Sequence, residues 1–116
     1  MRMWMINPAL LCNKHLLGEH GEIHKHRHNF VKKHNIAGRI NPVVQIEPRA
    51  MKKRHDILAK EMMRRKMNHK SDYSMPDISY LKSELKNAKV NLEISIKDLR
   101  NRCKVCKLLI EGNTYV

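Results

Sequence analysis

The chain is poor in aromatic residues, cysteines and acidic side chains. Aromatic residues make up only 4% of its 116 positions, so the core has to be built from Leu, Ile, Val and Met, and eight methionines suit an adaptable core. Three cysteines are an odd and small number, which argues against a disulfide framework and favours a reducing intracellular compartment. We therefore expect a cytoplasmic protein whose residues 1–116 form one domain.

Long hydrophobic runs are missing as well. No stretch approaches the ~18 consecutive apolar residues that a membrane span requires. The apolar start is interrupted by Asn7 and Pro8 and has no small-residue cleavage site, unlike a signal peptide. The sequence also contains no strand-rich region, internal repeat or low-complexity tract, so a helical fold is expected.

Positive charge dominates the chain. It has 24 Lys and Arg against 11 Asp and Glu, a net charge of +13 and an isoelectric point near 10.0. A field of this sign concentrates anions, so nucleic acid is the expected partner, ahead of an anionic membrane surface or an acidic protein. The basic groups are Lys32-Lys33; Arg49 with Lys52, Lys53, Arg54 and His55; Arg64, Arg65 and Lys66 with His69 and Lys70; and Arg100, Arg102, Lys104 and Lys107. They would set affinity rather than sequence choice, since no helix-turn-helix, zinc-finger or RNA-recognition signature is present.

Turn residues and hydrophobic spacing predict two helices in the first part of the chain. The pair Asn7-Pro8, an N-cap followed by a first-turn proline, begins a helix that we expect to run to about His34. Residues 35–48 contain a glycine and two prolines and are expected to form a loop. A second helix is predicted from near Arg49, with an apolar stripe made of Met51, His55, Leu58 and Met62.

A third helix is predicted to open at Asp77 and to stop at Gly112. Between them apolar residues recur in steps of three and four, which indicates one long helix or two in line with a break at 87–91. The expected fold is therefore all-α, a compact single-domain bundle of three to four helices with a long first helix and a long C-terminal helix.

The first predicted helix carries a polar face beside its apolar stripe. His15, Glu19, Glu22 and His26 follow one another at spacings of four, three and four, so they share one side of the helix. Such a face can hold a carboxylate near a ligand, and the alternative is a solvated polar face. The helix follows the N-terminus almost at once, which suggests that the terminal amine of Met1 belongs to the same site.

Two glycines lie within this helix. Gly18 and Gly21 each cost roughly 1 kcal/mol relative to alanine, and such a cost usually has a packing or close-approach reason. Without side chains there, another backbone can come near Glu19 and Glu22, either the N-terminal segment or a nucleic-acid strand. The alternative is tight packing against another helix.

Histidine spacing gives little support for a metal site. His20 and His24 are one helical turn apart, but no glutamate directly follows the first histidine as it does in zinc proteases. Phosphate contacts or a solvated face are therefore favoured for His24, His26 and His28.

Cys103 and Cys106 form one CxxC motif. A structural zinc site needs four ligands, and only Cys12 or a histidine remains to complete it. Both cysteines also lie on the apolar stripe of the third helix, so core cysteines are favoured over a zinc site or a redox pair. We expect no metal and no cofactor.

Several motifs resemble one known family. The residues of the first motif are Arg2, His15, Leu16, Glu19 and Glu22. In that order, and at those distances from the N-terminus, they resemble the phage pyrimidine-dimer DNA glycosylases of the endonuclease V type. The opening Met-Arg-Met-Trp and residues 14–20 look like a shorter branch of that family.

Two later blocks extend the resemblance over most of the chain. Arg54-His55-Asp56, with Glu61-Met62 and Arg64-Arg65, is similar to the family's second block. Residues 91–106, which end in the CxxC motif, are similar to its third.

The resemblance implies an all-helical DNA repair enzyme that excises UV-induced cyclobutane pyrimidine dimers and then nicks the abasic site. In this family the N-terminal α-amine forms an imine with deoxyribose C1′, and a first-helix glutamate supports the positive charge of the sugar. Carried over, Met1 supplies the amine and Glu22 is the catalytic carboxylate. The implied DNA-binding or site-supporting residues are Arg2, His15, Glu19, Lys25, His26, Arg54, Arg64 and Arg65. An α-amine suits this chemistry because its pKa of about 8 is closer to neutrality than that of lysine.

The chain departs from the family at several positions. A large Arg2 follows Met1, so Met1 is expected to be retained and has to be deformylated. Gly21 stands where known members have an arginine, so the substrate is either a pyrimidine dimer or a related damaged or modified base. We expect a monomer that binds double-stranded damaged DNA without a required protein or membrane partner, in the host cytoplasm if the chain is phage-encoded. The alternatives are a non-catalytic basic nucleic-acid-binding protein and a zinc-stabilised interaction module built on Cys103 and Cys106.

Overall fold

The structure is a computed structural model that describes residues 2–69 and 72–114, without the side chains of 113 and 114. Its helices are η1 (Pro8–Leu10), α1 (Asn13–Val31), η2 (Ala37–Arg39), η3 (Pro48–Ala50), α2 (Met51–Arg64), α3 (Ser83–Lys86), α4 (Leu92–Arg102) and α5 (Lys104–Thr114). No strand occurs within these described ranges, so the all-α prediction is confirmed.

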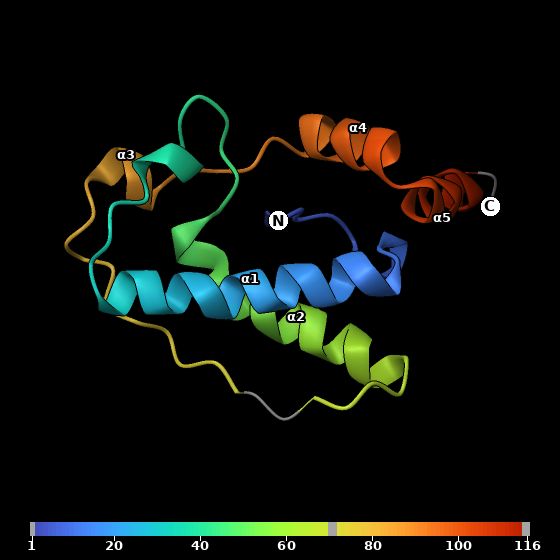
Figure 1. The fold of residues 1–116 in the computed structure, drawn as a ribbon, viewed down its shortest axis with the longest axis horizontal. Coiled ribbons are helices and arrows are strands. Elements are labelled where there is room, and N and C mark those ends of the chain that lie inside the picture. Colours follow the sequence, from blue (N-terminus) through green and yellow to red (C-terminus); the bar gives the residue numbers. More distant parts are fainter. Residues whose placement is uncertain (1, 70–71, 115–116) are drawn as a thin grey trace.

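Two helical layers enclose the N-terminal segment, residues 2–6 (Figure 1). α1 packs against α2 in one layer, and α4 packs against α5 in the other. The segment touches both layers, because Ser95 Oγ of α4 donates a hydrogen bond to the Trp4 carbonyl (2.7 Å) and the Trp4 ring meets His15 of α1 edge-on. Arg2, Met3 and Trp4 are all buried, so residues 2–4 are part of the interior.

The first predicted helix is divided in two. Asn7 Oδ1 accepts a hydrogen bond from Ala9 N (3.0 Å), but it caps only the short η1. Leu11 is extended and buried, and α1 begins two residues later. Arg65, the C-cap residue of α2, stabilises this break by donating to the carbonyls of Pro8 (3.1 Å) and Leu11 (2.7 Å), which a continuous helix would use internally.

The second predicted helix agrees with the structure to within a few residues. Its stripe of Met51, His55, Leu58 and Met62 is buried, as the spacing predicts. Through this stripe α2 packs onto α1, and Arg54 of α2 then reaches Glu19 of α1.

The prediction of one long C-terminal helix from Asp77 is wrong. Asp77 Oδ1 accepts from Ser79 N (2.9 Å) in a local turn, and helix begins only at α3. The predicted break at 87–91 is confirmed, and it is held by a buried hydrogen bond from Val90 N to Glu47 Oε2 (2.8 Å). α5 also continues past Gly112, so that glycine is not the helix stop.

A second break, which the sequence did not predict, lies at Cys103. This residue has an extended backbone (φ −136°, ψ 114°) between α4 and α5. The extended residue lets α5 fold back against α4 instead of continuing its axis, and it turns the CxxC motif toward the start of α1.

None of the helices in the described part of the chain has the length and apolar character needed to span a lipid bilayer.

Candidate functional site

Glu22 lies in the middle of α1 and is 8% exposed. One turn further on, His26 places its Nε2 atom 3.3 Å from Glu22 Oε1. The Asn29 amide nitrogen lies 3.2 Å from the other ring nitrogen of His26, Nδ1. Because an amide nitrogen can only donate, Nδ1 accepts and the imidazole proton resides on Nε2, facing Glu22.

Burial lowers the pKa of His26, although the Glu22 carboxylate acts in the opposite direction. His26 is therefore neutral near pH 7 and presents one N–H to the carboxylate. The arrangement holds the Glu22 side chain in place without neutralising it by a full positive charge.

Glu19 is fully buried one turn before Glu22 and binds Arg54 of α2. Arg54 donates from Nε to Glu19 Oε2 (2.6 Å) and from its terminal nitrogen to Oε1 (3.0 Å). The Arg54 guanidinium is only 4% exposed, so it faces α1 and not a ligand in solvent. This fork joins the helix that carries Glu22 to its neighbour in the same layer.

A cavity of about 290 Å³ opens beside the N-terminal segment and is lined by Arg2, Trp4, His15, Gln45, Asp98 and Arg102. Arg2 is buried in its wall, where its guanidinium donates to the Val44 carbonyl (3.2 Å) and lies 3.7 Å from Asp98. Burial lowers the pKa of Arg2, while the charges of Asp98 and Glu19 oppose this shift. Arg2 lines this cavity together with His15, which belongs to the polar face of α1 that also carries Glu22.

The sequence did not indicate three of the residues that line this cavity, namely Trp4, Gln45 and Asp98. They come from the N-terminal segment, the loop before α2 and α4, so no local spacing connects them. The only sequence signal was the place of Trp4 in the opening Met-Arg-Met-Trp motif.

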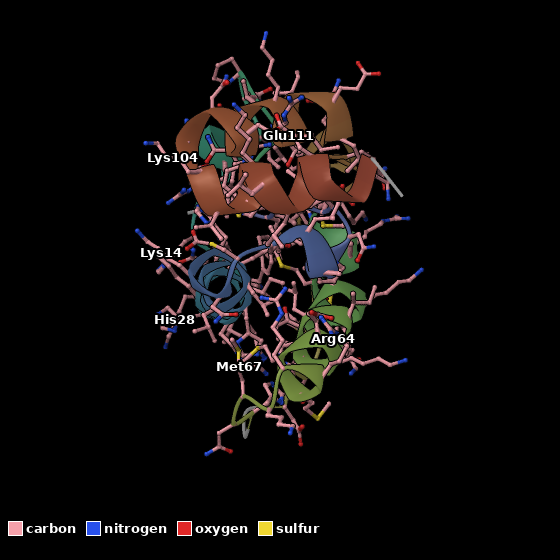
Figure 2. All side chains as sticks on the ribbon, turned by 90° about the vertical axis from the view of Figure 1, so that its right-hand side faces the viewer. Lys14, His28, Arg64, Met67, Lys104 and Glu111 are labelled. Carbon is pink, nitrogen blue, oxygen red and sulfur yellow. The ribbon has the colours of Figure 1, made fainter. Side chains whose placement is uncertain are left out.

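Basic side chains continue from the cavity along α1. Arg39 donates to the cavity residue Gln45 (3.4 Å), and Arg39 and Lys25 both lower the pKa of His26 through their charge. Lys14 and Lys25 are exposed on α1, and Figure 2 shows Lys14 and Lys104 on one side of the molecule and Arg64 on the other. Phosphate groups can therefore approach the Lys14 side.

Gly21 lies on this exposed edge of α1, next to Glu22. A Cβ atom built on Gly21 would meet nothing within 4 Å, so tight packing against another helix does not explain this glycine. The open space lies at the surface of α1 beside Gly21, where a strand from outside the protein has room, whereas Glu22 itself is buried.

Arg64 and Arg65 lie away from Glu22. Arg64 is exposed and paired with Glu61, whose pKa is lowered to about 2, first by the hydrogen bond from Arg64 and then by Arg65. Arg65 clamps η1 to the start of α1 at Asn13. Since a helix rises about 1.5 Å per residue, Asn13 and Glu22 are roughly 13 Å apart along α1.

A cluster of histidines occupies the opposite flank of α1, toward α2. Ring nitrogens of His20, His24 and His55 lie within 4.8 Å of one another, and His69 Nε2 is 3.0 Å from His20 Nε2. Burial and the neighbouring imidazoles lower the pKa of His20 to about 4. The expectation that His24 and His26 are solvated or bind phosphate is wrong. His24 packs against His20 and His55, and His26 is buried against Glu22.

The three cysteines meet at the other end of α1. Cys12 Sγ lies 3.8 Å from Cys103 Sγ and 3.1 Å from His15 Nδ1, and Cys106 Sγ lies 3.6 Å from the same nitrogen. His15 therefore directs Nδ1 into a group of sulfur atoms, while its ring also lines the cavity.

Comparison with known proteins adds one finding. A family model described as pyrimidine dimer DNA glycosylase matches residues 1–75. No curated protein and no solved structure matches the chain. The matched range includes α1, α2 and the residues Arg2, Glu19 and Glu22, whereas Asp98, Cys103 and Cys106 lie beyond it.

Proposed function

Since the chain belongs to the pyrimidine dimer DNA glycosylase family, we propose that it excises pyrimidine dimers, or a related damaged base, from double-stranded DNA and then cleaves the abasic site. The family supports a DNA repair glycosylase. The lyase step, the nucleophile and the roles of individual residues are our proposal.

In the proposed reaction the α-amine of Met1 attacks deoxyribose C1′ as the bond to the damaged base breaks. Loss of an amine proton and cleavage of the C1′–O4′ bond, which opens the sugar ring and leaves a protonated O4′, then give an imine between the nitrogen and C1′. Glu22 stabilises the positive charge that develops on the sugar, and its carboxylate takes part in the proton transfers that lead to strand cleavage. Met1 lies outside the described residues, so the amine enters the proposal through the family resemblance.

The observation that carries the proposal is the interior position of Arg2 beside the carboxylate face of α1. Hydrogen bonding to Val44, the charge of Asp98 and the Trp4 ring, 5.3 Å from the guanidinium carbon, all hold Arg2 in place. Arg2 and His15 line the same cavity, and His15 belongs to the polar face of α1 that also carries Glu22. The proposal requires that Met1 has a free amine and that this amine reaches Glu22.

DNA would lie along the exposed edge of α1. Lys14 and Lys25 mark the two ends of this edge, and Gly21 leaves the surface between them open. Such contacts with phosphates would supply most of the affinity, and a strained lesion is the cheapest site at which to open the base stack. Arg39 and Arg102 provide further positive charge near the cavity.

Borohydride trapping tests the proposal. The full chain is mixed with duplex DNA that carries a single abasic site, and separately with UV-irradiated duplex, and the imine is reduced to a stable adduct. We expect adducts with both substrates, mapped by peptide mass spectrometry to Met1. A variant with a short N-terminal extension is the control, because it moves the amine away from the site while it keeps every side chain.

Three outcomes would contradict parts of the proposal. Trapping on the abasic duplex alone would reject pyrimidine dimers as the substrate. An adduct on a lysine would reject Met1 as the nucleophile. Salt-sensitive DNA binding without any adduct would favour the non-catalytic nucleic-acid-binding protein.

A further inference from the structure

Four potential metal ligands from opposite ends of the chain meet beside η1. Cys12 and His15 come from the start of α1, and Cys103 and Cys106 come from the junction of α4 and α5. One ligand atom from each of the four residues lies within 4.8 Å of the other three. The sequence spacing is C-x2-H with C-x2-C, a Cys3His set of the type that binds structural zinc.

The distances suit a tetrahedral zinc ion. Zn–S bonds of about 2.3 Å and Zn–N bonds of about 2.0–2.1 Å place tetrahedral ligands roughly 3.6–3.8 Å from one another. Cys12 Sγ and Cys103 Sγ are 3.8 Å apart, and Cys106 Sγ is 3.6 Å from His15 Nδ1. The Cys12–His15 distance of 3.1 Å would lengthen by about half an ångström on binding.

Two backbone amides also point at the sulfur atoms. Cys12 N donates to Cys106 Sγ (3.2 Å), and Cys106 N donates to Cys103 Sγ (3.4 Å). Hydrogen bonds of this kind orient the sulfur ligands of a metal. A purely apolar role for the cysteines does not account for them, nor for an imidazole nitrogen that faces the sulfurs.

We propose that Cys12, His15, Cys103 and Cys106 bind one structural Zn²⁺ ion. As it binds, each of the three thiols releases its proton to solvent, and His15 coordinates through Nδ1. Four protein ligands close the coordination sphere, so the ion would stabilise the fold and would not activate water. This proposal is independent of the proposed function.

The zinc site would fix one wall of the cavity. The Trp4 ring contacts His15 (5.8 Å between centroids), and Arg102 directly precedes Cys103 in the chain. A metal bridge between α1 and the α4–α5 junction would therefore hold Trp4 and Arg102 in register across the cavity. With Nδ1 on the metal, the other nitrogen of His15 carries the proton and becomes a hydrogen-bond donor.

Metal analysis and cobalt substitution test the proposal on the full chain. Protein purified under reducing conditions should contain one equivalent of zinc. After replacement with Co²⁺, it should show the strong visible bands of a tetrahedral ion and the near-ultraviolet charge-transfer band of thiolate ligands. Chelation should lower the Tm of the wild-type protein.

Matched variants identify the ligands. Cys103→Ser should lose zinc, whereas Cys103→His, which keeps a ligand at that position, should retain it. His24→Ala removes a member of the histidine cluster, the other group of potential ligands, and should retain the full equivalent of zinc together with the thiolate band.

Several results would overturn the proposal. Wild-type protein with less than a small fraction of an equivalent of zinc, or with a cobalt spectrum that lacks the thiolate band, would reject it without recourse to any variant. Loss of zinc in His24→Ala but not in Cys103→Ser would move the metal to the histidine cluster. A disulfide between two of these cysteines in protein freshly purified under reducing conditions would also reject the site.

Discussion

Glu19 and Arg54 form a buried ion pair in which both carboxylate oxygens receive a hydrogen bond, at 2.6 and 3.0 Å. The pair links α1 to α2 about one helical turn before Glu22. Both charged groups are buried away from water, so removal of either one leaves the other as a buried charge without a partner.

We expect Arg54→Ala to lower the free energy of unfolding by roughly 3–5 kcal/mol, the usual cost of breaking a buried pair. Urea unfolding measures the change. Lys52→Ala, which removes an exposed pair with Asp56 on the same helix, should have little effect. A double variant, Glu19→Leu with Arg54→Met, should recover much of the loss, and equal losses in Arg54→Ala and Lys52→Ala would contradict the structural role.

Glu22→Gln should abolish strand cleavage at an abasic site while DNA binding remains close to that of the wild type. The amide keeps the shape of the side chain but can neither stabilise a positive sugar nor accept a proton, so we expect at least a roughly 100-fold loss of rate. Single-turnover cleavage and filter binding measure the two effects.

Glu93→Gln is the matched control, because it makes the same change of charge at an exposed position on α4. It should cleave like the wild type. A Glu22→Gln protein that is fully active would rule out this carboxylate as the catalytic group.

The sequence predicted the elements whose periodicity is local. The stripe of α2 follows from spacing alone, and the structure buries Met51 accordingly. Spacing also placed Glu22 on one face of α1 with His15, but it did not predict that this carboxylate is buried. The breaks between helices were harder to predict from the sequence, because they depend on hydrogen-bond partners far away in the chain. Arg65 satisfies the carbonyl of Leu11, so the break there cannot be recognised from its own residues. The break at 87–91, where Glu47 binds the amide of Val90, was one of the two alternatives that the sequence offered.

The candidate functional residues divide in the same way, into those that local spacing indicates and those that depend on distant parts of the chain. Order and spacing near the N-terminus were enough to suggest Glu19 and Glu22 and the family to which the chain belongs. The cysteine group was not predicted as a unit, because α5 reaches Cys12 only after the turn at Cys103. A helix that continued straight through that residue would have kept its cysteines apart from α1.

Gly21 allows the approach of DNA to be tested separately from stability. Gly21→Ala should raise the free energy of unfolding by about 0.5–1 kcal/mol, because a Cβ meets nothing there and alanine favours helix. Gly21→Leu should fold equally well but weaken DNA binding and cleavage if a strand passes over this edge of α1. Thermal unfolding and cleavage assays give the two results.

Gly112→Leu is the control for that series. Gly112 is also helical and exposed, and a Cβ there likewise meets nothing within 4 Å. It should leave DNA cleavage unchanged. If Gly21→Leu cleaved damaged DNA as well as Gly112→Leu, the strand would have to approach the protein elsewhere.

Stability should fall as the pH drops from about 6.5 to about 4, because of His20. Its pKa is lowered to about 4 in the folded protein, by burial and by His24, His55 and His69, against about 6.5 in an unfolded chain. Between these values the unfolded state binds more protons, so this contribution is complete above pH 6.5 and is lost on acidification.

Urea midpoints at about pH 7 and about pH 5 should therefore differ less for His20→Gln than for the wild type. His28→Gln, an exposed change on the same helix, should keep the wild-type difference, and an unchanged difference in His20→Gln would assign the acid sensitivity to other groups.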